Sequence, residues 1–161
     1  MAKPPRDRAP SASNTYFVTA NAFASQPIFQ SERIANLLIE TFLDYRSQGK
    51  FLLHEFVVMP NHLHLLFTTG TGVTLERSMQ LIKGGFSYRA GKLLEVRGEI
   101  WQRGYVDHRV RDVHDYAQHN HYIRQNPVNA NLAKSAEEYP FSSAFPSFNG
   151  DDPPQRLKPI S

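Results

Sequence analysis

The sequence predicts one α+β domain, an antiparallel sheet with helices on one face. Strand-like and helix-like patterns follow one another in the order β-α-β-β-α-β-α. The middle strand patterns, 51–59 and 62–68, are separated only by Pro60-Asn61, which favours a hairpin. The other connections include helical patterns that can cross a sheet face. This order is typical of the ferredoxin-like sandwich.

The first half of the chain supplies three strands and one helix. Tyr16-Phe-Val-Thr-Ala is a β-rich run and predicts the first strand. Ser31 is placed to cap a helix that Gly49 closes. The apolar positions of this helix keep helical spacing: Ile34, Leu37, Leu38, Phe42 and Tyr45. The run 51–59 is mostly apolar, so we expect a buried strand, and 62–68 continues as its partner.

A second long helix follows the hairpin. Thr74 is its predicted cap, and Glu76 lies in the first turn, where the helix dipole favours an acidic side chain. Its apolar stripe recurs at helical steps: Leu75, Met79, Ile82, Phe86 and Ala90. Gly84 and Gly85 either weaken this helix or let another part of the chain approach its backbone.

A short strand and a last helix complete the predicted domain. The strand covers 106–110, and Asp112 is placed to cap the helix. We expect this helix to end near Asn126 because Pro127 follows. The domain thus covers 14–145.

The ends of the chain differ from this domain in composition. Residues 1–13 are rich in Pro, Ser and Arg and predict a flexible basic tail, while 146–161 predict an irregular Pro-rich tail. The start lacks the apolar stretch of a secretory signal, and no run of about 18 apolar residues predicts a membrane span. We therefore expect a cytoplasmic protein without membrane contact. The absence of cysteine excludes disulfides and thiolate metal sites.

Positive charge is concentrated in one third of the chain. The formal net charge is +3, yet residues 77–111 hold eight basic and three acidic residues. Such a local excess is typical of a protein that binds a polyanion, although a solvated surface gives the same composition.

His62-Leu63-His64 lies in a predicted strand. Alternate side chains of a strand point to the same face, so both imidazoles project together, about 7 Å apart at their Cα atoms. Such a pair is able to hold one divalent ion, with oxygen or nitrogen as the other ligands. Mg²⁺ or Mn²⁺ suits this set of ligands, and so does Zn²⁺. The alternative is that these two histidines bind no metal and make their hydrogen bonds with solvent or within the core.

The last predicted helix carries two tyrosines on different faces. At about 100° per residue, Tyr116 falls on the apolar stripe with Val113, Ala117 and Ile123. Tyr122 falls on the opposite, polar side, as an exposed residue or a functional one. Asn126 is its neighbour one turn later. A metal ligand at Asn126 would bring the phenol near an ion, as phosphoryl transfer by a tyrosine requires.

Four sequence blocks resemble one known family, in the same order and across about residues 14–145. They are Val57-Val-Met-Pro-Asn-His-Leu-His-Leu-Leu, Ile100-Trp-Gln-Arg-Gly-Tyr-Val-Asp-His-Arg-Val-Arg, His121-Tyr-Ile-Arg-Gln-Asn-Pro-Val and Tyr139-Pro-Phe-Ser-Ser. The combination is similar to the REP-associated tyrosine transposases, a branch of the single-tyrosine HUH transposases. Departures from the family pattern are Val106 in place of an aromatic residue and Asn131 in place of Gly.

The resemblance implies an enzyme that nicks and joins single-stranded DNA near hairpins through a 5′-phosphotyrosine. By position, Tyr122 on the C-terminal helix corresponds to the nucleophile, and His62 and His64 to two ligands of Mg²⁺ or Mn²⁺. Asn126 occupies the place of the third ligand, which is Gln in many relatives. His119, one turn before Tyr122, is a candidate base or a supporting residue.

DNA contacts follow from the basic segment. We expect phosphate contacts from four residues: Lys83, Arg103, Arg109 and Arg111. Tyr88, Trp101 and Tyr105 are candidates for stacking on unpaired bases, with core packing as the alternative for Trp101. The resemblance leaves a homodimer and a monomer open.

Three other functions stay open at this point. One is a DNA-hairpin-binding protein without catalysis, and another is a replication or conjugation nickase with the same chemistry. A plain metal-binding domain would explain the histidines and leave the basic segment without a role.

Overall fold

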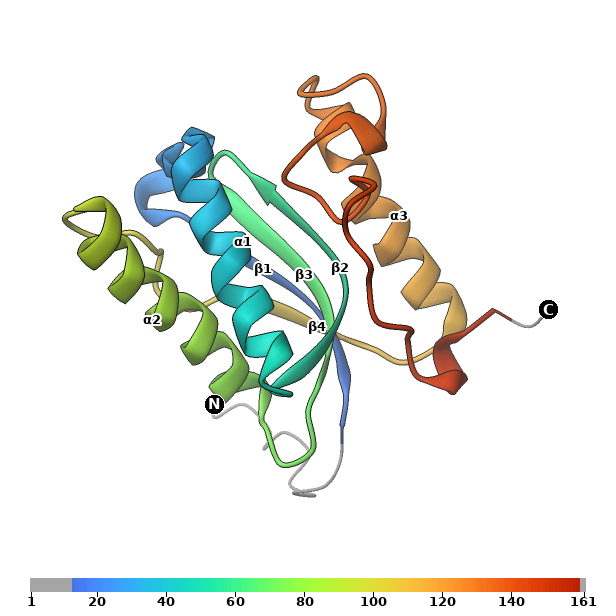
Figure 1. The fold of residues 1–161 in the computed structure, drawn as a ribbon. Helices are drawn as coiled ribbons and strands as arrows, with labels where there is room; N and C mark the ends of the chain where they lie inside the picture. The colour runs from blue at the N-terminus through green and yellow to red at the C-terminus, as the bar shows by residue number, and fades with distance from the viewer. Residues whose placement is uncertain (1–12, 160–161) are drawn as a thin grey trace.

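The computed structural model describes residues 13–159 and contains one antiparallel sheet of four strands (Figure 1). The strands lie in the order β2-β3-β1-β4, and each neighbouring pair is antiparallel. Their bounds are β1 Thr15–Asn21, β2 Phe51–Met59, β3 His62–Thr69 and β4 Val106–Val110. The predicted ferredoxin-like fold class and its β-α-β-β-α-β-α order are confirmed. Of the predicted N-terminal tail, residues 1–12 lie outside the described residues.

Two helices cover one face of this sheet. α1 spans Glu32–Ser47 and α2 spans Leu75–Leu94, and the predicted caps Ser31 and Thr74 each accept a hydrogen bond from the first turn of their helix. Their apolar stripes pack on alternate strand residues such as Val18, Leu65 and Phe67, all fully buried or nearly so. Packing of these stripes against the sheet forms the larger of the two cores of the described domain.

Gly85 lets α1 and α2 approach closely. A Cβ atom at this position would collide with the ring of Tyr45 from α1, whereas one at Gly84 would meet open space. The glycine pair was predicted either to weaken the helix or to let another part of the chain approach it, and the second explanation applies to Gly85.

The third helix, α3, spans Val113–Asn129 and packs on the opposite face of the sheet, as Figure 1 shows, so the prediction of helices on one face holds for α1 and α2 but not for α3. Asp112 caps it as predicted. The predicted end near Asn126 is wrong, because the helix continues through Pro127. Proline removes one backbone donor but lies here in the last turn and is buried. The carbonyl of Pro127 accepts a hydrogen bond from the backbone N–H of Leu132, which completes the helix end.

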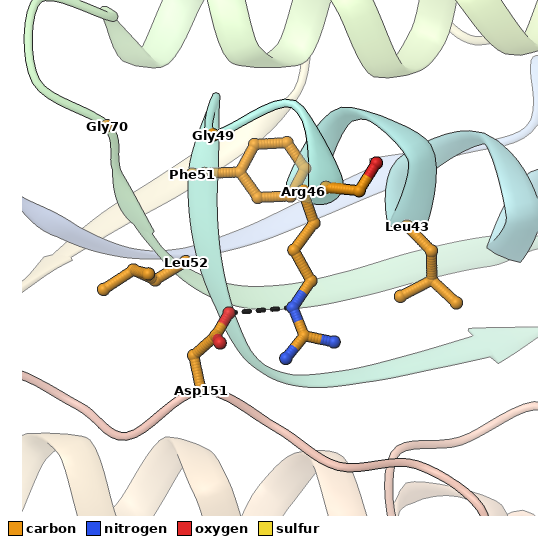
Figure 2. Close-up of a pocket in the computed structure, with 8 residues that line it drawn as sticks. Leu43, Arg46, Gly49, Phe51, Leu52, Gly70 and Asp151 are labelled. Atoms are coloured by element: carbon orange, nitrogen blue, oxygen red, sulfur yellow. Dashed lines mark hydrogen bonds and ion pairs between the residues drawn. The ribbon is translucent and has the colours of Figure 1, made fainter.

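The segment after α3 covers the outer edge of β2. Residues 139–143 exchange backbone hydrogen bonds with Phe56 and Val58. Farther on, the backbone N–H and carboxylate of Asp151 bind the backbone of Leu53. That carboxylate also accepts from Arg46 of α1 at 2.8 Å, as Figure 2 shows. An exposed strand edge would invite pairing with another chain, and this segment occupies it.

Short 3-10 helices occur in the connecting segments: η1 Phe23–Ser25, η2 Ile28–Gln30, η3 Ala136–Glu138 and η4 Gln155–Leu157. Of the predicted tail 146–161, the part described, up to residue 159, is irregular apart from η4, yet it packs on the domain, and Leu157 is fully buried beside α3. No helix among the described residues is long and apolar enough to cross a membrane.

His54 is expected to make folding stability depend on pH. Its ring is buried between the Asp151 carbonyl and the Thr68 hydroxyl, at 2.8 and 2.7 Å, and this burial lowers its pKa below 6.5. Below pH 6.5 the unfolded chain therefore binds a proton that the folded chain resists, and stability falls as the pH falls.

The expected size of that effect is at most about 1.4 kcal/mol per pH unit. Urea unfolding of the wild type and His54→Gln between pH 7.5 and 5 measures it, and the variant should show the shallower slope. Equal slopes would contradict the assignment to His54.

Candidate active site

The two histidines of the predicted pair lie on the face of the sheet that α3 covers. In β3, His62 and His64 alternate with Leu63 and Leu65, which point into the core beneath α1 and α2. The two imidazole rings lie edge to face, with centroids 4.7 Å apart. The strand alternation predicted from the sequence therefore brings both rings together.

Each ring is held through its Nδ1 atom. His64 Nδ1 lies 2.9 Å from the Thr19 hydroxyl of β1, and His62 Nδ1 lies 2.7 Å from the Asn61 side-chain oxygen. If Nδ1 of His62 donates to that oxygen, Nε2 keeps a free lone pair. The same holds for His64 when its Nδ1 donates to Thr19.

The Nε2 atom of His64 is buried and has no hydrogen-bond partner. Burial and the neighbouring His62 lower the pKa of His64 to about 3, so this ring is neutral near pH 7. Burial also lowers the pKa of His62. Two neutral imidazoles with free Nε2 lone pairs are the form of histidine that binds a metal ion.

Asn61 is expected to set the metal affinity through His62. Removing the oxygen in Asn61→Ala frees the ring of His62 to rotate and change tautomer, and should weaken divalent-ion binding about 10- to 100-fold. Asn61→Asp keeps an acceptor at the same place and should restore affinity. Isothermal titration with Mn²⁺ measures both, and an Asn61→Ala variant with unchanged affinity would contradict this role.

Tyr122 lies beside this pair, on α3 of the same chain. Its ring centroid is 5.3 Å from that of His64 and 5.9 Å from that of Phe17 in β1. Phe17 in turn stacks on His64 at 5.2 Å. The Tyr122 ring thus packs beside His64, and because it is 49% exposed a ligand from solvent is still able to reach it.

On α3, Tyr116 is buried and Tyr122 is exposed, as their helical spacing predicted, but the buried face lies at a different angle from the predicted one. Tyr116 and Ile123 are buried as predicted, and desolvation raises the pKa of Tyr116. Ala117 is exposed instead, while Pro127 is buried. The buried stripe is thus rotated by about 40° at 100° per residue, which moves Tyr122 from the solvent side to the flank.

Asn126 is half-buried on α3, one turn after Tyr122. Among the described residues, no third His, Cys, Asp or Glu joins His62 and His64 within ligand distance. Any third protein ligand would therefore come from another residue type, and Asn126, which has an amide oxygen, stays the predicted one.

His119 contacts other groups on the same face. Its Nδ1 lies 2.9 Å from the Asp115 carbonyl and 3.0 Å from the Asp115 carboxylate, and its ring packs on Phe17 at 4.5 Å. Through Phe17 the ring is linked to Tyr122. These contacts suit a residue that supports the position of Phe17 and Tyr122.

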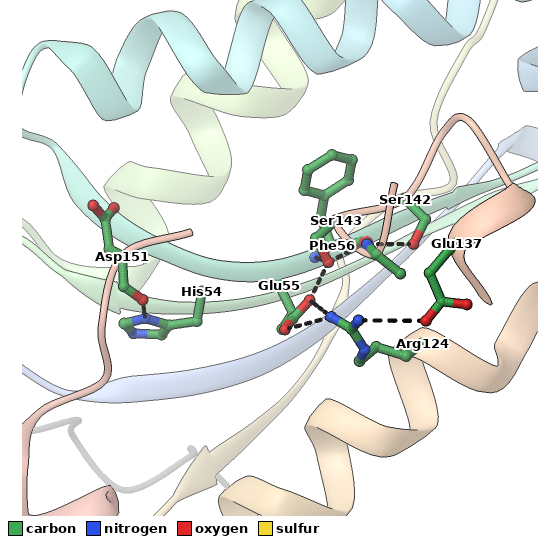
Figure 3. Close-up of polar contacts among 9 residues, drawn as sticks. His54, Glu55, Phe56, Arg124, Glu137, Ser142, Ser143 and Asp151 are labelled. Atoms are coloured by element: carbon green, nitrogen blue, oxygen red, sulfur yellow. Dashed lines mark hydrogen bonds and ion pairs between the residues drawn. The ribbon is translucent and has the colours of Figure 1, made fainter. Parts of the chain in front are cut away.

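A partly buried ion pair joins α3 to β2 and to the segment after α3 (Figure 3). Arg124 approaches the Glu55 carboxylate at 3.3 Å and Glu137 at 4.0 Å, and the Ser143 hydroxyl also donates to Glu55. Glu55 is only 9% exposed, so removing a partner would leave a buried charge. This network fixes how α3 lies on the sheet.

Several residues that position the site were not predicted from the sequence. An acidic residue inside the apolar run Phe51–Met59 signals a buried charge in need of a partner, which would have pointed to Glu55. Nothing in the sequence pointed to Thr19 and Phe17 in this way. Strand alternation in β1 indicates only that their side chains lie on the same face of the sheet. Their partners come from strands and a helix far away in the sequence.

The four predicted DNA contacts divide into two pairs. Arg103 and Arg111 are exposed. Lys83 Nζ donates to the carbonyls of Gln102 and Gly104, and Arg109 donates to the Asn14 side chain at 2.6 Å. Lys83 and Arg109 thus also make hydrogen bonds within the protein.

The aromatic residues that were predicted to stack on unpaired bases also differ in their exposure. Trp101 is buried and donates to the Lys83 carbonyl, so its packing alternative is correct. Tyr88 is 67% exposed.

The family model described as "Transposase IS200 like" matches residues 15–126, a range that runs from β1 to Asn126 and includes the histidine pair and Tyr122. The chain belongs to this transposase family. The resemblance noted in the four sequence blocks is thereby confirmed, and with it the place of this chain among the tyrosine transposases.

Individual relatives agree with this assignment. The REP-associated tyrosine transposase of Escherichia coli (strain K12) is 28% identical over 108 residues, or 66% of this chain and 62% of that protein. An uncharacterized protein of Haemophilus influenzae is 31% identical over 98 residues, or 47% of this chain and 54% of that protein. The chain therefore spans somewhat over half the length of these relatives.

The fold is also that of a solved structure, a REP-associated tyrosine transposase bound to a REP hairpin. The TM-score is 0.73 with 22% identity, and the match covers 100% of this chain and 99% of that one. At this identity the likeness concerns the fold.

Proposed function

We propose that this chain nicks and rejoins single-stranded DNA next to hairpins, with Tyr122 as the nucleophile and His62, His64 and Asn126 as ligands of a divalent ion. One observation carries the proposal. The Tyr122 ring lies 5.3 Å from the ring of His64, whose buried Nε2 atom has no partner. A phenol beside an unused pair of metal ligands is the combination that phosphoryl transfer by tyrosine requires.

The donor set fits a divalent ion. A buried polar atom without a partner costs free energy, and a metal bond to the Nε2 atom of His64 would remove that cost. Two neutral imidazoles and one amide oxygen suit Mn²⁺ and, with added waters, Mg²⁺. When bound, such an ion supplies positive charge to the non-bridging oxygens of the scissile phosphate.

The protein's own contribution is to position the nucleophile. The Oη atom of Tyr122 forms a bond to phosphorus as the bond from phosphorus to the 3′ oxygen breaks. The phenol loses its proton and the departing oxygen gains one, which leaves a 5′-phosphotyrosine and a 3′-hydroxyl. The phosphotyrosine link is itself a phosphodiester, so another 3′-hydroxyl is able to attack it, release the tyrosine and join strands.

One chain holds all the proposed groups. Tyr122 approaches His64 of its own β3, and the Glu55–Arg124 pair helps to hold α3 in that place. We therefore propose that a monomer is able to cleave. For DNA binding we assign phosphate contacts first to the exposed Arg103 and Arg111, with Lys83 and Arg109 beside them.

The direct test is a covalent adduct. The full chain is incubated with labelled single-stranded hairpin DNA and Mn²⁺ or Mg²⁺, and a band that survives denaturation is digested and mapped by mass spectrometry. The expected result is a nucleotide on the peptide that contains Tyr122. Hairpin binding without an adduct on any substrate would favour the alternative of a catalytically silent hairpin-binding protein.

A further inference from the structure

We infer that His108, Asp115 and His119 form a second binding site for a divalent transition-metal ion of the zinc class. The three side chains offer ligand atoms that all lie within 4.8 Å of one another. Two imidazoles and a carboxylate are a common ligand set for Zn²⁺, with the fourth position left to water. This inference goes beyond the proposed DNA chemistry and does not depend on it.

The contacts converge on the Asp115 carboxylate. One carboxylate oxygen lies 2.7 Å from His108 Nε2, and the other lies 3.0 Å from His119 Nδ1. Ligand atoms around a tetrahedral zinc ion lie about 3.3 Å apart. Small side-chain rotations would therefore convert the hydrogen-bonded cluster into a coordination shell.

The cluster is built on fixed elements. His108 lies in β4 opposite Phe17 of β1, and Asp115 and His119 lie one turn apart at the start of α3. The two imidazole rings stack at 4.9 Å, and His119 also packs on Phe17. Ligands that are already ordered lose little conformational entropy when an ion binds.

The exposure of His108 also suits metal binding. His108 is half-exposed. Its second ring nitrogen is therefore able to carry the imidazole proton toward water when Nε2 binds a metal.

This cluster is separate from the His62 and His64 pair. Phe17 contacts His64 with its ring centroid at 5.2 Å and His119 at 4.5 Å. Neither His62 nor His64 belongs to the group of ligand atoms around Asp115. An ion in the second site would connect β4 to the first turns of α3, the helix that carries Tyr122.

The test uses the full, untagged chain in a background without the first pair, His62→Ala/His64→Ala. Isothermal titration with Zn²⁺ should show one bound equivalent, and Co²⁺ should give the visible absorption bands of a tetrahedral nitrogen and oxygen site. Adding His108→Ala or Asp115→Asn should weaken binding at least about tenfold. Bound Zn²⁺ should also slow hydrogen exchange of backbone amides at the start of α3.

Matched controls use the other exposed histidines of α3, His114→Ala and His121→Ala, which should keep both the affinity and the cobalt spectrum. Circular dichroism checks that each variant is folded. The inference is overturned if the background binds no zinc. It is also overturned if a control variant weakens binding as much as His108→Ala does, or if Asp115→Asn leaves binding unchanged.

Discussion

Replacing Tyr122 with phenylalanine is expected to abolish the covalent DNA adduct, with a loss of more than about 10⁴-fold. The change removes the one oxygen proposed to form the bond to phosphorus, and catalysis that depends on a nucleophile falls by this order when the nucleophile is removed. Tyr122 is 49% exposed and its ring contacts are kept in phenylalanine, so folding should be unaffected. Gel quantification of the adduct, with hairpin affinity measured alongside, checks both parts.

Tyr116→Phe is the matched control on the same helix. The Tyr116 side chain is buried in the smaller core, with a hydrogen bond to Asn120, and has no place in the proposed step. Adduct formation by this variant should stay within a few-fold of wild type. An adduct that survives in Tyr122→Phe but disappears in Tyr116→Phe would reverse the assignment of the nucleophile.

The second large effect concerns His64. The double variant Thr19→Val/His64→Leu is expected to lose adduct formation by more than about 100-fold, since it removes one proposed metal ligand and its support. In the presence of a chelator, however, the same variant should be at least as stable toward unfolding as the wild type. It replaces a buried Nε2 atom without a partner, which costs about 1–3 kcal/mol, and removes both members of one hydrogen bond.

Thr19→Val alone separates these two effects. It removes the hydroxyl bound to Nδ1 of His64 while Nε2 also has no partner, so the metal-free protein should lose about 1 kcal/mol of stability. Urea unfolding in the presence of a chelator measures all three proteins. Clear destabilisation of the double variant would contradict the view that His64 is kept for metal binding at some cost to the fold.

Local rules were sufficient to predict the elements of this fold. The caps Ser31, Thr74 and Asp112 and the turn at Pro60-Asn61 act within a few residues, and the structure has each of them as predicted. The end of α3 was the exception. The rule for a residue before proline is also local, but burial of Pro127 and the bond from Leu132 outweighed it.

The site was predictable to the extent that its residues share one element. Strand alternation places His62 and His64 on one face, and helical spacing separates Tyr122 from Tyr116. No local rule indicates that α3 packs over β3, nor how it is rotated. The contacts that hold α3 there, such as that between Glu55 and Arg124, join residues that lie far apart in the sequence.

The sequence by itself therefore determined the family, the order of elements and the candidate histidine pair and tyrosine, because periodicity, caps and motifs are properties of neighbouring residues. Only the tertiary structure decided that the Tyr122 ring meets His64 within one chain, because that contact joins residues of β3 and α3. It likewise decided that His108 meets Asp115 and His119. Contacts of this kind depend on how a helix packs on a sheet, and packing is set by the whole core.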